Sequence, residues 1–179
     1  MSADDAAERL RAARRLLVVG PSGAGKTRLA LALGEALALP VVHLDARRWR
    51  EGWIALDEPE WRDVVRGLVE APAWIMDGTY EGTLDLRVPA AEAVVVLEPP
   101  RPVYLGGLLA RRLRVRDRPR ADAPAGQRLD RAFLRYAWRY ESDTRPALRA
   151  ALERDGGRAL VIHLPSRRAG RKLVAKLAS

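Results

Sequence analysis

Hydrophobic and polar positions along the chain predict short buried strands that alternate with amphipathic helices. Short apolar runs bounded by Gly, Pro or charged residues are typical of buried strands, whereas apolar residues three and four positions apart are typical of helices. Five runs fit a strand: "RRLLVVG" from residue 14, "VVHLD" ending at Asp45, "AWIMDG", "AEAVVVLEPP" and "RALVIHL".

Helical spacing fills most of the segments between these runs. Asp57, with Pro59 and Glu60 after it, has the pattern of a helix N-cap with a capping-box acid. The other helices are predicted over residues 3–14, 26–38, 102–116, 127–153 with a bend at Pro146, and 166–178.

This alternation predicts an α/β fold in which helices cover both faces of a parallel sheet. Residues 1–179 are predicted to form a single domain. Ligands of such folds bind at the carboxyl ends of the strands. Gly20, Asp45 and Asp77 each end a predicted strand, so we expect the site to lie there.

Composition limits the class of protein. The 179 residues are 48% hydrophobic, include no Cys and contain no apolar run near the roughly 18 residues of a membrane span. The first residues, "MSADDAAERLRAARR", resemble neither a signal nor a transit peptide, so a cytoplasmic protein without membrane contact is expected. The net charge of +9 attracts polyanions, either nucleic acid or nucleotide phosphates.

The stretch "VVGPSGAGKTRLAL" contains the pattern G-x-x-x-x-G-K-[ST] between a predicted strand and a predicted helix. Backbone N–H groups of such a loop and the helix N-terminus hold phosphates, a Lys reaches the β- and γ-phosphates, and a Thr hydroxyl ligates Mg²⁺. Lys26 and Thr27 take these two roles. The residues predicted to bind ATP here are Gly20, Pro21, Ser22, Gly23, Ala24, Gly25, Lys26 and Thr27.

Two acids at strand ends are candidates for chemistry. Asp45 is either the group that accepts a proton from an acceptor hydroxyl, or an N-cap of the segment after it. Asp77, in "WIMDGTY", is either a ligand of Mg²⁺ through water or a turn residue before Gly78.

Residues 111–126 are rich in arginine and predict a short lid that closes over phosphates. Arg side chains grip phosphate oxygens in pairs and keep their charge. Arg112 and Arg116, four positions apart, are predicted to act in catalysis, and Arg118 to contact the nucleotide. A solvated basic face is the alternative for each of them taken alone.

The motifs "GPSGAGKT", "VVHLD", "WIMDGTY", "RRLRVRDRP", "LDRAFLRYAWRY" and "HLPSRR" resemble the P-loop proteins known as DNA topology modulation proteins or adenylate kinase-related proteins. The resemblance implies a three-layer α/β/α fold like that of nucleoside monophosphate kinases, with a five-stranded parallel sheet in the order 2-3-1-4-5. It also implies ATP on the loop, an acceptor site within about residues 45–70, and Ser166 and Arg167 against the adenine. The chain departs from adenylate kinases in its shorter lid and in the lack of a matching AMP-binding arginine motif.

The segment "DARRWREGWIALDEPEW" is predicted to form the wall of the acceptor site. Arg47 and Arg48 suit a phosphate, while Trp49 and Trp53 either stack against a base or sugar or cover the edge of the sheet. Trp61 is interpreted as a core residue. His43 and His163, which lie within predicted strands, are interpreted as core residues too.

Two functions follow from these observations. The first is an ATP-dependent kinase that acts on a nucleotide or another small molecule, as a monomer or homodimer. The second is a nucleic-acid-associated protein that uses ATP as a regulatory ligand or hydrolyses it slowly. The arginines concentrate where a lid is expected, and no nucleic-acid-binding signature is present, so the kinase is favoured and any binding of nucleic acid should be weak.

Overall fold

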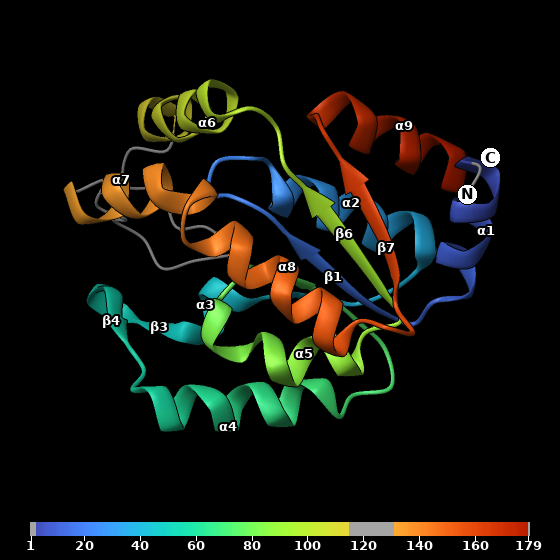
Figure 1. Ribbon diagram of the computed structural model, residues 1–179, viewed down its shortest axis with the longest axis horizontal. Coiled ribbons are helices and arrows are strands. Elements are labelled where there is room, and N and C mark those ends of the chain that lie inside the picture. Colours follow the sequence, from blue (N-terminus) through green and yellow to red (C-terminus); the bar gives the residue numbers. More distant parts are fainter. Residues whose placement is uncertain (1–2, 115–130, 179) are drawn as a thin grey trace.

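Five parallel strands form a central sheet with helices on both faces in the computed structural model, which describes residues 3–114 and 131–178 (Figure 1). The sheet strands are β1 (Arg15–Val19), β2 (Val41–His43), β5 (Trp74–Asp77), β6 (Ala93–Leu97) and β7 (Leu160–Leu164). Their spatial order is β2-β5-β1-β6-β7, which confirms the predicted order 2-3-1-4-5. Every neighbouring pair in this sheet is parallel.

The helices connect these strands in the way that parallel pairing requires. The α-helices are α1 (Ala3–Ala12), α2 (Lys26–Leu37), α3 (Leu44–Arg48), α4 (Glu58–Val69), α5 (Leu84–Ala90), α6 (Arg101–Arg114), α7 (Arg131–Trp138), α8 (Thr144–Asp155) and α9 (Arg167–Leu177). Three 3-10 turns are η1 (Glu51–Trp53), η2 (Glu81–Thr83) and η3 (Arg139–Glu141). A small antiparallel pair, β3 (Trp49–Arg50) and β4 (Ile54–Ala55), was not predicted.

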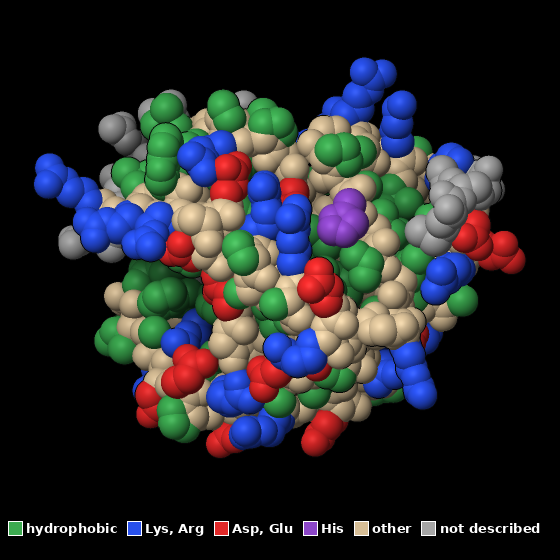
Figure 2. Space-filling model, in the orientation of Figure 1, with side chains coloured by type: hydrophobic (Ala, Val, Ile, Leu, Met, Phe, Trp, Pro, Cys, Tyr) green, Lys and Arg blue, Asp and Glu red, His purple; other side chains and the backbone are tan. Residues whose placement is uncertain are grey.

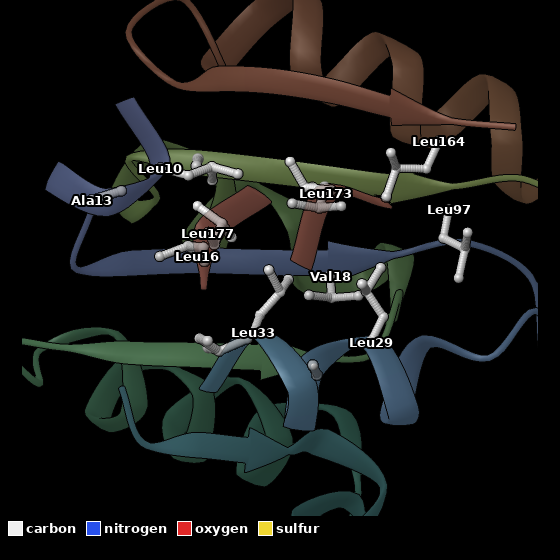
Figure 3. Packing of buried hydrophobic residues seen from close by; sticks show 14 of the residues in the cluster. Leu10, Ala13, Leu16, Val18, Leu29, Leu33, Leu97, Leu164, Leu173 and Leu177 are labelled. Carbon is white, nitrogen blue, oxygen red and sulfur yellow. The ribbon is translucent and has the colours of Figure 1, made fainter. Parts of the chain in front are cut away.

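Two hydrophobic cores fill the space between the sheet and its helices. One core joins α1, α2 and α9 to one face of the sheet, where leucines of all three helices meet the strands (Figure 3). The other core joins α4, α5 and α8 to the opposite face, and the completely buried Trp74 and the nearly buried Trp61 belong to it. Within the two described ranges, no helix is long and apolar enough to cross a membrane.

The structure corrects four details of the predictions, two of which concern where elements end or bend. The second strand ends at His43, because the next residue, Leu44, begins α3 and is fully buried in a core. The long helical stretch breaks at η3, where Tyr140 is buried, and not at Pro146. Pro146 lies in the first turn of α8, where its missing N–H leaves no hydrogen bond unmade.

The other two corrections concern α5 and His163. The short helix α5 was not expected, because its seven residues include Pro89 and the charged Asp85 and Arg87. His163 is exposed and is not a core residue, since β7 is an edge strand of the sheet.

Candidate active site

The phosphate loop, Gly20–Thr27, joins β1 to α2 and has a backbone shape that only glycine permits. Gly20 has a φ of 141°, and a Cβ built on it would lie 2.1 Å from the carbonyl oxygen of Leu97. Gly23 has a φ of 84°, and its Cβ would lie 2.2 Å from the carbonyl oxygen of Tyr104. Gly25 is the N-cap of α2 and has no side chain to cap the first N–H groups of the helix, which have no partner within the helix. This backbone fits a phosphate group.

Side chains hold the loop in this shape. The Arg167 guanidinium, at the start of α9, donates from Nε to the Ala24 carbonyl at 2.8 Å and from Nη2 to the Gly23 carbonyl at 2.6 Å. The Lys26 ammonium donates to the Pro21 carbonyl at 3.0 Å. Arg167 therefore lies beside the predicted ATP site, although its contact with adenine stays a prediction.

Three further residues predicted to contact ATP or Mg²⁺ carry hydroxyl groups, and these are Ser22, Thr27 and Ser166. Ser22 and Thr27 are half-buried, and Thr27 is the second residue of α2. Ser166 is the N-cap of α9, and its hydroxyl accepts from the N–H of Ala169 at 3.1 Å. Its predicted contact with adenine is not tested by this arrangement.

Asp45 lies in the first turn of α3 and not at the end of a strand, which corrects the prediction. Nor is it an N-cap, because the N-cap of α3 is His43. Its carboxylate Oδ1 accepts a hydrogen bond from the Tyr80 hydroxyl at 2.6 Å. The candidate base is therefore held by a tyrosine that follows β5, and this tyrosine was not singled out from the sequence.

Tyr80 is fixed on several sides. Its Oη accepts from the Trp49 indole N–H at 3.1 Å, and its ring lies 5.2 Å from the Trp61 ring, between centroids. Burial and then the nearby Asp45 carboxylate raise the pKa of the Tyr80 hydroxyl far above its ordinary value. The Tyr80 hydroxyl consequently stays protonated and donates a hydrogen bond to Asp45.

Asp77, the last residue of β5, pairs with His43 across the sheet. The register places His43 beside Asp77, and the distance from His43 Nδ1 to Asp77 Oδ2 is 3.2 Å. The Asp77 side chain is 7% exposed. This pairing explains why His43 is tolerated in a strand, and it leaves Asp77 at the carboxyl edge, level with Val18 of β1.

The segment predicted to form the acceptor wall, residues 45–61, stays a prediction in that role, and its Arg48 is already paired. Arg48 donates to the Asp57 carbonyl at 3.2 Å, lies 3.4 Å from the Glu58 carboxylate and sits over the Trp61 ring. Arg47 is exposed. Trp61 is 1% exposed, which confirms its interpretation as a core residue.

The two remaining tryptophans of this wall, Trp49 and Trp53, are half-buried. Their ring centroids lie 5.4 Å apart. The Trp49 indole also bonds Tyr80, so Trp49 is part of the site whether or not it stacks against an acceptor.

The predicted lid lies mostly outside the described residues. Arg112 belongs to α6, while Arg116 and Arg118 fall within residues 115–130 and lie outside the described ranges. Their roles stay predictions.

Sequence reasoning also missed Arg87, a completely buried arginine of α5. Its guanidinium donates to the carbonyl oxygens of Gly78 at 3.0 Å and Tyr80 at 2.8 Å, to that of Thr79, and to the Thr83 hydroxyl at 3.2 Å. Burial lowers the pKa of Arg87 to about 10, so it is still charged at neutral pH. A surface arginine in a short helix would have the same local sequence, so no signal in the chain marks it as buried.

No protein-family model matches the chain, and no curated protein matches its sequence. Its fold matches solved structures of kinases. Shikimate kinase from Acinetobacter baumannii in complex with shikimate has a TM-score of 0.60 and 17% identity, over 96% of this chain and 94% of that chain. A sugar kinase from Janibacter sp. HTCC2649 has a TM-score of 0.56 and 19% identity, over 91% of both chains.

A gluconokinase from Sinorhizobium meliloti 1021 has a TM-score of 0.50 and 18% identity, over 92% of this chain and 91% of that chain. At these identities the likeness shows the fold alone. The chain has the P-loop kinase-like fold that its sequence predicts. The narrower resemblance to DNA topology modulation proteins stays a prediction.

Proposed function

We propose that the protein transfers the γ-phosphoryl group of Mg-ATP to a hydroxyl group of a small-molecule acceptor. One observation carries the proposal: two consecutive residues touch both halves of the site. The Thr79 hydroxyl bonds Gly20 of the phosphate loop, and the Tyr80 hydroxyl bonds Asp45. Because consecutive Cα atoms are about 3.8 Å apart, one short stretch of backbone connects the phosphate loop to Asp45.

The residues on each side suit the two halves of the reaction. The loop N–H groups and Lys26 hold the phosphates and offset the charge that develops during transfer. Asp45 orients the acceptor hydroxyl and takes its proton. The acceptor oxygen forms its bond to the γ-phosphorus as the bond from that phosphorus to the ADP oxygen breaks. Mg²⁺, when bound with ATP, would neutralise charge on the phosphates.

The donor set fits Mg²⁺ in such a role. Mg²⁺ in kinase sites keeps several waters and takes one or two protein oxygens together with the phosphates. Thr27, in the first turn of α2, and Asp77, at the end of β5, offer a hydroxyl and a carboxylate. In the described part of the chain no three His, Asp or Glu residues cluster as a metal cage, so we expect the ion to arrive with the nucleotide.

We further propose that the acceptor is an uncharged hydroxyl compound, such as a sugar, a polyol or a nucleoside. The wall around Asp45 offers the rings of Trp49 and Trp53, which suit an apolar face of such a molecule. Besides Arg47, the arginines that follow Asp45 most closely in the sequence are Arg48 and Arg50. They are paired with Glu58 and Glu60, respectively. A phosphorylated acceptor would have to compete with these carboxylates.

A screen of acceptors tests this function. ADP release from Mg-ATP would be measured with panels of sugars, polyols, nucleosides and nucleoside monophosphates, and phosphorylated products would be identified by mass spectrometry. We expect one uncharged hydroxyl compound to be phosphorylated by the unaltered protein and not by Lys26→Ala. Transfer to monophosphates alone would overturn the proposed acceptor class. Hydrolysis without any transfer would overturn the kinase.

Binding to nucleic acid is the less favoured function. On the face shown in Figure 2, acidic side chains lie among the basic ones. Several arginines of the described residues are paired with carboxylates, as Arg62 is with Asp85 and Arg145 with Glu98. We expect weak DNA binding at physiological salt that Mg-ATP displaces. Fluorescence anisotropy with duplex and single-stranded DNA at two salt concentrations measures it, because each phosphate contact steepens the salt dependence. A cytoplasmic location and a monomeric or homodimeric state also stay proposals.

A further inference from the structure

We propose that Gly78–Tyr80, here named the bridge, is a positioning device that sets the phosphate loop and Asp45 relative to each other, and that Arg87 is the positioning residue that anchors it. The part played by Tyr80 rests on the proposed function, whereas the parts played by Thr79 and Arg87 do not.

The bridge contacts the phosphate loop through Thr79. Its hydroxyl accepts from the Gly20 N–H at 3.0 Å and donates to the Gly20 carbonyl at 2.8 Å. A hydroxyl can do both at once because it carries one donor and two acceptor sites. Gly20 is the first residue of the loop, and it lies so close to the Leu97 carbonyl that there is no room for a side chain. Thr79 therefore satisfies both backbone polar groups at the point where the loop leaves β1.

The bridge contacts the acceptor side through Tyr80. This residue has φ 38° and ψ 81°, a left-handed conformation that is unfavourable for a bulky side chain. Strained residues of this kind persist only where the surroundings hold them, and they gather at functional sites. With this backbone conformation, the Tyr80 hydroxyl bonds Asp45 while the preceding residue, Thr79, bonds Gly20.

Arg87 holds the bridge in place through hydrogen bonds to its backbone. Its guanidinium is completely buried and donates to all three bridge carbonyls. Its direct partners in the described part of the chain are these carbonyls and the Thr83 hydroxyl, and the nearby acidic groups of Glu81 and Asp85 also favour its charged form. A buried cation is costly unless it is hydrogen-bonded, so the charge of Arg87 and the positions of the three carbonyls depend on each other. A planar fork of five N–H donors can bind them together, whereas a lysine ammonium cannot match this geometry.

Three variants test the bridge through two separate readouts. The first readout is the affinity for Mg-ATP by calorimetry. The second is amide hydrogen exchange by mass spectrometry over residues 20–27 and 43–48. Neither depends on knowing the acceptor, so a failure of the bridge can be told from a failure of the proposed kinase activity.

For Thr79→Val we expect the affinity for Mg-ATP to fall about fivefold to a hundredfold, because buried Gly20 groups lose their partner. Thr79→Ser keeps the hydroxyl and should stay within about threefold of the original affinity. Equal affinities for the Val and Ser variants would overturn the role of Thr79.

For Arg87→Lys we expect faster exchange in both residues 20–27 and residues 43–48, together with weaker binding of Mg-ATP. Arg62→Lys is the matched control, since Arg62 bonds Gly82 and Asp85 just beyond the bridge and should change neither segment. Faster exchange in Arg87→Lys confined to residues 78–90 would show a local structural role and overturn the proposal. If Arg87→Lys does not fold, Thr79→Val and Tyr80→Phe decide the question.

For Tyr80→Phe we expect unchanged affinity for Mg-ATP and faster exchange in residues 43–48 alone. Once an acceptor is known, turnover should fall about tenfold or more. Normal exchange in residues 43–48 would overturn the link between Tyr80 and Asp45.

Discussion

The two halves of the candidate site differ in which interactions determine their shape. The phosphate loop is one run of eight residues whose shape is set by backbone angles, with glycines where a Cβ would meet a carbonyl. The acceptor side is built from side-chain hydrogen bonds among Asp45, Trp49 and Tyr80, which come from two separate stretches of the chain. A site formed by backbone groups binds any phosphate of the right shape. A site formed by side chains can adapt to a new acceptor through single substitutions.

Lys26→Ala should have the largest effect on the affinity for Mg-ATP, and it should act on the phosphate side only. Losing one charge-assisted contact costs about 1.5–3 kcal/mol, or roughly tenfold to more than a hundredfold in affinity. We therefore expect calorimetry to show no micromolar binding of Mg-ATP, with an unchanged circular dichroism spectrum. Lys172→Ala, an exposed lysine of α9, is the control and should bind normally. Retained micromolar affinity in Lys26→Ala would remove this loop from the site.

Asp45→Asn should have the opposite profile. If the carboxylate takes the acceptor proton, turnover should fall about 10²- to 10⁴-fold while the affinity for Mg-ATP stays the same. Steady-state kinetics on the acceptor found by screening, together with calorimetry, separate the two effects. Asp63→Asn removes an exposed acid of α4 and should leave both unchanged. Near-normal turnover in Asp45→Asn would reduce Asp45 to a structural partner of Tyr80.

The same difference decides what could be predicted from the sequence. The phosphate loop and the Asp57 cap, whose Oδ1 accepts from the Glu60 N–H at 2.8 Å, depend on residues close together in the chain. The sheet order was predicted from the resemblance to a known family. Tyr80 and Arg87 matter through contacts that only the folded chain brings about. Asp45 was singled out from the sequence, but it was assigned to the end of a strand. It lies in a helix because β2 ends before the buried Leu44.

Gly23→Ala should weaken the phosphate side less than Lys26→Ala does. Its φ of 84° and the clash with the Tyr104 carbonyl make an added Cβ costly, by about 1–3 kcal/mol. Urea denaturation should show this loss of stability, and calorimetry a weaker binding of Mg-ATP. Gly67→Ala is the matched control, because a Cβ there meets nothing within 4 Å. In a helix it should be neutral or stabilise by up to about 1 kcal/mol. Equal effects of the two changes would contradict a loop whose shape depends on glycine.

The smallest effect is expected at the amino ends of the strands, far from both halves of the site. Glu92, just before β6, accepts from the Arg14 N–H at 2.7 Å and from Arg15 Nε at 3.1 Å. The bond from the Arg14 N–H, and then the contacts with Arg15, lower the pKa of the Glu92 carboxyl below its ordinary value of 4.5. A lowered pKa means that the folded state favours the carboxylate. The stabilisation is therefore complete above about pH 4.5 and is lost as the pH falls through the folded-state pKa.

Glu92→Gln should accordingly reduce the free energy of unfolding at pH 7 by no more than about 0.5–1 kcal/mol, because the pair is partly exposed and screened by solvent. The difference from the unaltered protein should shrink as the pH is lowered toward 3, since both proteins then carry an uncharged group at this position. Urea denaturation at several pH values measures it. Binding of Mg-ATP and turnover at pH 7 should not change. A loss of ATP affinity in Glu92→Gln would mean that the site is coupled to the far ends of the strands, and that its two halves are not set at the carboxyl edge alone.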